Sequence, residues 1–149
     1  MLEGLETRLD DALRIARSMG EYTLDFFRER AIEIDVKTDG TIVTEVDRET
    51  ELLGRRLIQE AHPGDAFLGE EHGQVDGNNS WRWVVDPIDG TVSFTRGVPL
   101  YGVLVGIEYE GMPVGGVIHL PALNETAWGG RERGAFHQLG DAPPSPAHV

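Results

Sequence analysis

Residues 83–94 read Trp83-Val84-Val85-Asp86-Pro87-Ile88-Asp89-Gly90-Thr91-Val92-Ser93-Phe94. A run of apolar residues ends here in two carboxylates, and a glycine and a threonine follow them. Proline fixes its own φ and lacks a backbone N–H, so Pro87 favours an exit from a strand. The pattern predicts a strand over Trp81 to Val85 that delivers Asp86 and Asp89 to one turn.

A second acidic element lies upstream, where Gly69-Glu70-Glu71 follows the apolar pair Phe67-Leu68. Hard divalent cations prefer carboxylate and carbonyl oxygens as ligands. Two close carboxylates repel each other unless a cation lies between them. We therefore expect Glu70, Asp86 and Asp89 to contribute to one metal site, with the carbonyl of Ile88 as a further ligand.

The turn after Asp86 also has a simpler interpretation, because Asp, Pro and Gly are common in surface turns. The preceding apolar strand and the second acidic element argue against a plain turn. Gly90 permits close approach of another group to the backbone, and amides at the start of a following helix can hold a phosphate. The hydroxyl of Thr91 could orient a water molecule.

Two helices are expected on periodicity. Apolar residues at three- and four-residue spacing predict a helix from residue 2 to about residue 30, with a bend or interruption at Gly20. A second helix is expected up to about Ala61, with Thr44 as its N-cap and Asp47 three residues further on. We expect this second helix to bury four apolar side chains: Leu52, Leu53, Leu57 and Ile58.

The remaining segments read mostly as short strands. Residues 32–43 are expected to be extended or loop-like, and residues 73–80 a polar surface loop. Strands are expected at 67–69, 81–85, 102–109, 114–120 and 125–128, with a short helix at 91–94. The segment 140–149 holds three prolines and is expected to be a loop or tail.

Composition restricts the class of protein. The chain has 149 residues, enough for one domain with a core, and its formal net charge is -13. Nucleic-acid binding requires clustered Lys and Arg, so nucleic acid is an unexpected partner. Neither an apolar run long enough to span a membrane nor the basic start of a signal peptide is present, so we expect a cytoplasmic protein. The absence of cysteine excludes disulfides and thiolate sites.

Three motifs in order resemble the inositol monophosphatase family of magnesium-dependent, lithium-sensitive phosphatases. They are Val43-Thr44-Glu45-Val46-Asp47, Gly69-Glu70-Glu71 and Asp86-Pro87-Ile88-Asp89-Gly90-Thr91. The resemblance extends over residues 10 to 136 or so. It implies hydrolysis of a phosphate monoester by direct attack of a water molecule, with two or three Mg²⁺ ions and inhibition by Li⁺.

The resemblance also implies a role for each matching residue. The first ion would be bound by Glu70, Asp86 and the carbonyl of Ile88, the second by Asp86 and Asp89, and a weaker third by Glu70. The catalytic residues would be Asp47, Thr91 and Glu70, with Asp47 and Thr91 orienting and deprotonating the water. The phosphate would be held by Asp89, Gly90, Thr91 and Lys37. Asp47 is equally suited to cap a helix, and Lys37 could be a solvated loop residue.

The fold implied by the resemblance is α+β: the N-terminal half of a layered αβαβα sandwich, with two helices packed on a largely antiparallel sheet. Residues 1–149 would form an N-terminal metal-binding phosphatase domain. The family's later WDxAAG element, which completes the second metal site, is not found in this sequence. We therefore expect an exposed apolar sheet face, and as partner either a second copy in a homodimer or a chain that supplies the missing half.

The substrate is a small-molecule phosphate monoester under this interpretation. The segment Ser93 to Gly102 resembles the branch that includes histidinol-phosphate phosphatases, which favours histidinol phosphate. Inositol monophosphate is the alternative, and a nucleotide 3′-phosphate is a third candidate. A different class of function also stays open, namely a fragment that binds metal or phosphate without turnover.

Overall fold

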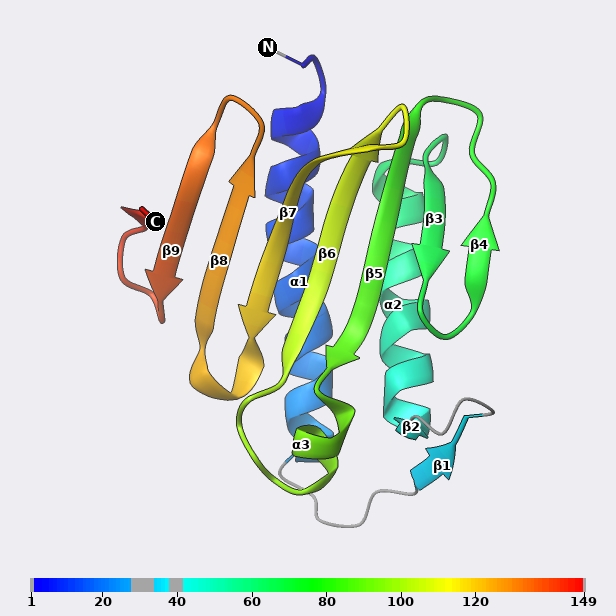
Figure 1. Ribbon diagram of the computed structural model, residues 1–149, viewed down its shortest axis with the longest axis vertical. Coiled ribbons are helices and arrows are strands. Elements are labelled where there is room, and N and C mark those ends of the chain that lie inside the picture. Colours follow the sequence, from blue (N-terminus) through cyan, green and yellow to red (C-terminus); the bar gives the residue numbers. More distant parts are fainter. Residues whose placement is uncertain (1, 28–33, 38–41, 149) are drawn as a thin grey trace.

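The computed structural model describes residues 2–27, 34–37 and 42–148. Its centre is an eight-stranded sheet of order β10-β9-β8-β7-β6-β5-β3-β4, and two long helices cover one face of it (Figure 1). All neighbouring strands are antiparallel except β3 and β5. The expected α+β fold, with helices on a largely antiparallel sheet, is confirmed.

The strands of the sheet are β3 (Ala66–Gly69), β4 (Gly73–Val75), β5 (Trp81–Asp89), β6 (Gly102–Tyr109), β7 (Met112–Leu120), β8 (Glu125–Gly130), β9 (Gly134–Leu139) and β10 (Ser145–Pro146). A separate two-stranded ribbon consists of β1 (Ile34–Val36) and β2 (Ile42–Thr44). The helices are α1 (Leu5–Phe27), α2 (Glu45–Ala61), the short α3 (Thr91–Thr95) and the 3-10 helix η1 (Pro121–Leu123). No helix in the described part of the chain is long and apolar enough to cross a membrane.

Helix α2 begins as the sequence predicts. Thr44 is its N-cap: the Thr44 hydroxyl accepts from the backbone N–H of Asp47, and the Asp47 carboxylate accepts from the backbone N–H of Thr44. This reciprocal pair satisfies two of the backbone donors that a helix start leaves free. The helix buries Ile58 but leaves Leu52 45% exposed, so the prediction that Leu52 is buried was wrong. Leu52 lies on the solvent side of α2, because the side that faces the core carries Glu51, Gly54 and Ile58.

Helix α1 runs through Gly20 without interruption, which corrects the expected bend. Gly20 is needed for close packing instead. A Cβ at this position would lie 2.6 Å from Cδ2 of His119 and 2.9 Å from Cγ of Pro121. The glycine therefore lets β7 and η1 approach the helix backbone. The predicted residues 28–30 of this helix lie outside the described part of the chain.

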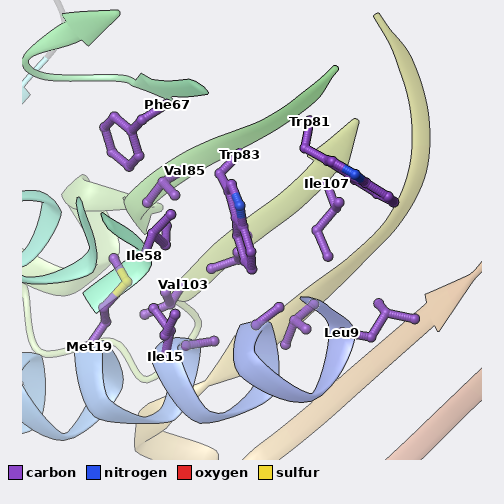
Figure 2. Close-up of a cluster of buried hydrophobic side chains, with 14 of the residues drawn as sticks. Leu9, Ile15, Met19, Ile58, Phe67, Trp81, Trp83, Val85, Val103 and Ile107 are labelled. Carbon is purple, nitrogen blue, oxygen red and sulfur yellow. The ribbon is translucent and has the colours of Figure 1, made fainter. Parts of the chain in front are cut away.

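The main hydrophobic core lies between the helices and the sheet. Figure 2 shows side chains of α1, α2 and the central strands meeting in it, with Trp83 at the middle. Trp83, Ile15 and Met19 have no measurable exposure. Burial of large apolar side chains of this kind contributes about 2 kcal/mol each and is the main stabilising contribution to the fold.

The opposite face of the sheet carries an apolar groove. Leu104 pairs with Ile118, and Ile118 pairs with Ala127, so their side chains lie on the same side of the sheet, away from the helices. Ile118 is 52% exposed. Glycines of the same strands widen the groove between these side chains. The expected exposed apolar face of the sheet is thus present on the side away from the helices.

Four strands differ from the sequence prediction or were not part of it. Residues 73–75, expected within a polar loop, form the edge strand β4 by pairing with β3. Strand β9 was not predicted, and it extends the sheet beyond β8. Strand β5 also continues to Asp89 rather than ending at Val85 as predicted. The segment 140–148 is mostly irregular and contains the two-residue strand β10.

Candidate active site

Two of the predicted motifs meet at one end of the parallel pair β3 and β5. Gly69 is in register with Val85, and the amide N–H of Glu70 donates to the carbonyl of Val85 over 3.2 Å. Because parallel strands run in the same direction, the residues that follow their carboxyl ends emerge at the same edge of the sheet. Glu70 therefore leaves β3 beside the position where Asp86 stands on β5.

The turn itself is fixed by a bulge and by a buried side chain. Pairing between β5 and β6 shifts register between Asp86 and Asp89, and Pro87 lies within this irregularity. Ile88 is only 3% exposed and belongs to a second hydrophobic cluster, together with Phe94 and Tyr101. Burial of Ile88 anchors the segment that carries the two aspartates. Asp89 and Gly90 are exposed at its end.

Gly90 and Thr91 follow directly. Gly90 has a φ of 84°, in the left-handed region that favours glycine, and it caps the start of α3. The Thr91 hydroxyl lies 3.2 Å from the carbonyl oxygen of Ile88 and 3.0 Å from Oδ1 of Asp47, and it can donate to either. Asp47 is 1% exposed, so this contact joins a buried carboxylate on α2 to the beginning of α3. The predicted pair of Asp47 and Thr91 is thus brought together, and Asp47 also caps α2.

The carboxyl of Asp86 is electrostatically perturbed. Burial is the main cause, and the negative charges of Glu70, Asp89 and Asp47 add to it, so that the pKa of Asp86 is raised to about 7. A hydrogen bond from the backbone of Ile88 opposes this shift. Four carboxylates thus influence one another at this point, and a cluster of acids with a strongly shifted pKa is a frequent mark of a functional site.

The chemistry of these donors fits a hard divalent cation, because they are oxygen ligands with uncompensated negative charge. They are not gathered around a single point, however. Among the described residues, no three His, Cys, Asp or Glu side chains lie close enough to hold one ion. The Glu70 side chain is 55% exposed, and its Oε1 lies 3.9 Å from the ammonium of Lys37.

Lys37 lies against the same acidic element. Its ammonium donates to Oε1 of Glu71 over 3.0 Å and lies 2.9 Å from Oε2 of the same carboxylate. Burial raises the pKa of Glu71, while the bond from Lys37 opposes the shift. Lys37 thus brings a positive charge to the edge of the acidic cluster. A role for Lys37 at the phosphate stays a prediction.

Sequence reasoning missed one residue of this region, Glu51. It lies on α2 four residues after Asp47, and its carboxylate accepts hydrogen bonds from the amides of Glu71 and His72 over 2.8 and 2.7 Å. A spacing of four residues places Glu51 one helical turn from Asp47 and on the same face of α2. This spacing is the feature of the sequence that could have indicated Glu51. The partners of this carboxylate, Glu71 and His72, are 20 and 21 residues away, so the sequence alone did not reveal them.

Comparison with known proteins shows the family to which the chain belongs. A sequence model of the Inositol monophosphatase family matches residues 5–148. The chain belongs to this family. It is 46% identical over 125 residues to a histidinol-phosphatase of Chlorobaculum parvum. The matched region covers 84% of this chain and 48% of that protein. It is 37% identical over 133 residues to an inositol-1-monophosphatase of Mesorhizobium japonicum, with 89% and 49% covered.

The fold is shared as well. The solved structure of an IMPase from Thermotoga maritima superposes with a TM-score of 0.80 at 30% identity, covering 89% of this chain and 51% of that one. The chain thus spans about half the length of the curated relatives and of the solved structure that it matches.

Proposed function

We propose that this chain carries the metal-binding and water-activating residues of a Mg²⁺-dependent phosphatase that hydrolyses a small-molecule phosphate monoester. The observation that carries the proposal is the meeting of two acidic motifs at the ends of β3 and β5, where the amide of Glu70 donates to the carbonyl of Val85 beside Asp86. The negative charges of Glu70, Asp89 and Asp47 add to burial in raising the pKa of Asp86, so these carboxylates repel one another. A bound divalent cation would remove that repulsion. The hydrogen-bonded pair of Asp47 and Thr91 lies on the adjoining turn.

In this proposal the ions, two or three in number, would be held by Glu70, Asp86, Asp89 and the carbonyl of Ile88. When bound, they would supply charge neutralisation for the phosphate and a lower pKa for a water molecule. Inhibition by Li⁺ belongs to the same proposal. Glu70 would have a second role as a catalytic residue, as the resemblance to the family implies.

The chain's own residues would handle the proton. The hydroxyl of Thr91 donates to Asp47, so its lone pairs can accept a hydrogen bond from a water molecule. Oδ2 of Asp47 accepts from the amide of Thr44, which fixes the carboxylate toward Thr91. A proton taken from the water at Oγ1 of Thr91 would pass to Asp47. The amides of Gly90 and Thr91, the carboxylate of Asp89 and the ammonium of Lys37 would orient the phosphate.

Histidinol phosphate is the substrate that we propose first. The support is the 46% identity to a histidinol-phosphatase, against 37% to an inositol-1-monophosphatase. Inositol monophosphate is therefore the second candidate and a nucleotide 3′-phosphate the third. The proposal includes a cytoplasmic location and association with a second protein chain, either a second copy in a homodimer or one that supplies the other half of the fold.

The test is release of phosphate from histidinol phosphate and from inositol 1-phosphate by this 149-residue chain in Mg²⁺. A second arm adds the C-terminal half of the related histidinol-phosphatase as a separate chain. We expect release in at least one arm, and its loss in Asp89→Asn but not in Asp141→Asn, a matched change at an exposed aspartate. Absence of release in both arms, for both esters, would contradict the enzymatic proposal.

A second candidate function is binding of metal or phosphate without turnover. It is favoured by the carboxylates of the described residues, no three of which lie close enough to hold one ion. Calorimetric titration with Mg²⁺ separates the two. Binding of Mg²⁺ without release of phosphate in either arm would support this second function.

A further inference from the structure

The proposed mechanism makes no use of Glu51, although this carboxylate is the most deeply buried acid near the site. Glu51 has no measurable exposure. Besides the amides of Glu71 and His72, its Oε2 accepts from Nδ1 of His72 over 2.5 Å. A buried carboxylate is destabilising unless hydrogen bonds compensate for lost hydration. All three of these bonds come from the two residues that directly follow Glu70.

The Glu51 carboxylate lies so close to the backbone of residue 69 that only glycine fits there. A Cβ built on Gly69 would lie 2.3 and 2.8 Å from the two carboxylate oxygens of Glu51 and 2.4 Å from the carboxyl carbon. No side chain fits in that space while Glu51 keeps its position. The glycine of the Gly69-Glu70-Glu71 motif is thus explained by the approach of the Glu51 carboxylate to the backbone.

Helix α2 therefore contacts two parts of the site through the carboxylates of Asp47 and Glu51. Asp47 contacts Thr91 at the turn after β5, and Glu51, one helical turn later, contacts the turn after β3. Glu70 lies between these contacts, with its amide on the carbonyl of Val85. The backbone on both sides of Glu70 is thereby fixed, whereas its side chain stays exposed.

We propose that Glu51 is a positioning residue that holds the backbone of Glu70 to His72, so that the Glu70 carboxylate is presented to a Mg²⁺ ion beside Asp86. This inference rests on the proposed metal site. Groups that orient metal ligands through hydrogen bonds commonly change metal affinity by about 10- to 100-fold when they are removed. Glu51 acts on the ligand through the backbone and touches no substrate.

The test compares four variants of this chain by Mg²⁺ titration calorimetry and by amide hydrogen exchange. Glu51→Gln places an NH₂ group against the backbone N–H of Glu71 or His72, so that one of these two hydrogen bonds is lost. Glu51→Asp keeps the charge but is one methylene shorter. Gly69→Ala disturbs the contact from the other side. Glu60→Gln makes the same chemical change at an exposed position of the same helix and serves as the control.

We expect Glu51→Gln, Glu51→Asp and Gly69→Ala each to weaken Mg²⁺ binding by about tenfold or more. The amides of Glu71 and His72 should exchange faster in these variants, and Glu60→Gln should match the wild type in both measurements. If Glu51→Asp binds Mg²⁺ like the wild type, the effect of Glu51 is one of charge and the positioning role is wrong. If the Glu51 variants do not fold, Gly69→Ala still decides the question, because it retains every carboxylate.

The failures of the two proposals are distinguishable. Wild-type affinity in Glu51→Gln and Gly69→Ala, despite faster amide exchange, would overturn the positioning role and leave the metal site intact. A wild-type chain that does not bind Mg²⁺ would overturn the metal site itself, and the role of Glu51 with it.

Discussion

The hydroxyl of Thr91 lies 3.0 Å from Oδ1 of Asp47, although the two residues are 44 positions apart. The contact connects the first turn of α2 to the first residue of α3. On the other side, Oδ2 of Asp47 accepts from the amide of Thr44. One carboxylate therefore caps a helix and holds the candidate water-activating hydroxyl, so substitutions here affect both stability and activity.

The pair of Asp47 and Thr91 leads to the first prediction. In Asp47→Asn, an NH₂ group replaces a carboxylate oxygen that accepts a hydrogen bond from the amide of Thr44 or the hydroxyl of Thr91. The substitution should lower the free energy of unfolding by about 1–2 kcal/mol. Thr91→Val removes the hydroxyl with little change of volume and should abolish phosphate release, while Thr91→Ser should retain it. Urea unfolding and the phosphate-release assay measure these effects. Equal activity of Thr91→Val and Thr91→Ser would contradict a role for the hydroxyl.

The second prediction concerns Asp86, whose pKa in the folded chain is about 7 against an ordinary value of 3.8. The folded state binds this proton more tightly than the unfolded state, so the contribution to stability is full below pH 3.8 and is lost as the pH rises through 7. Asp86→Asn should therefore stabilise the metal-free chain at pH 8 by about 1–2 kcal/mol, a value reduced for solvent screening, and have little effect at pH 4.

Magnesium provides the complementary measurement for Asp86. Mg²⁺ should raise the melting temperature of the wild type at pH 8, because a ligand that binds only the folded state stabilises it. The same addition should leave Asp86→Asn unchanged. Asp141→Asn is the matched control and should respond like the wild type. A melting temperature of Asp86→Asn that rises with Mg²⁺ as much as that of the wild type would exclude Asp86 as a ligand.

The elements around the site were predictable because their signals are local. The capping residues Thr44 and Asp47 lie three positions apart, and strand β5 contains the apolar run Trp83 to Val85. Strand β4 was missed because Gly73 to Val75 is polar and becomes a strand only by pairing with β3. Strand β9 likewise depends on a distant partner: Phe136 stacks on Trp128 of β8, with ring centroids 5.8 Å apart.

The site was predictable to a similar extent. Its motif residues were found because acids, glycine and threonine recur at fixed spacing within each motif. The contact of Glu51 with the turn after β3 was missed, since it depends on packing between α2 and residues 20 positions later. The perturbed pKa of Asp86 likewise follows from burial and from charges that include two acids on other segments, Glu70 and Asp47.

The third prediction concerns two helical glycines. Gly20→Ala would place a methyl group against the ring of His119 and the ring of Pro121, neither of which can withdraw easily. We expect a loss of about 1–3 kcal/mol, despite the better helix propensity of alanine. Gly54→Ala is the control, because its methyl group meets only the flexible end of Met19 and should cost less. Urea unfolding of both variants tests this order, and a more destabilised Gly54→Ala would contradict it.

The fourth prediction concerns Asp65, which joins α1 to the sheet. Its carboxylate accepts from Nε and Nη2 of Arg8, from Nε1 of Trp83 and from Nδ2 of Asn79, each over 2.8 Å. Burial alone would raise the pKa of Asp65, but these bonds outweigh burial and lower it. Asp65→Asn should cost about 3–5 kcal/mol, because the Arg8 charge loses its partner. A loss as small as that of Asp141→Asn, measured by urea unfolding, would show that this network adds nothing to stability.

The last prediction is an acid sensitivity that comes from His119. Burial is the main cause that lowers the pKa of His119 from 6.5 to about 4, and the charge of Arg17 adds to it. The unfolded chain then binds the proton more readily, so stability is full above pH 6.5 and is lost as the pH falls toward 4. The loss from this residue should reach about 3 kcal/mol.

Unfolding in urea at pH 7.5 and at pH 4.5 measures this effect of His119. His119→Gln should reduce the difference in stability between the two pH values, whatever it does to stability at pH 7.5. The matched change at an exposed histidine, His148→Gln, should leave that difference as in the wild type. Since His119 packs against Gly20 and hydrogen-bonds Thr126, its protonation loosens the contact between α1 and the sheet. Equal differences in all three proteins would assign the acid sensitivity to the carboxylates instead.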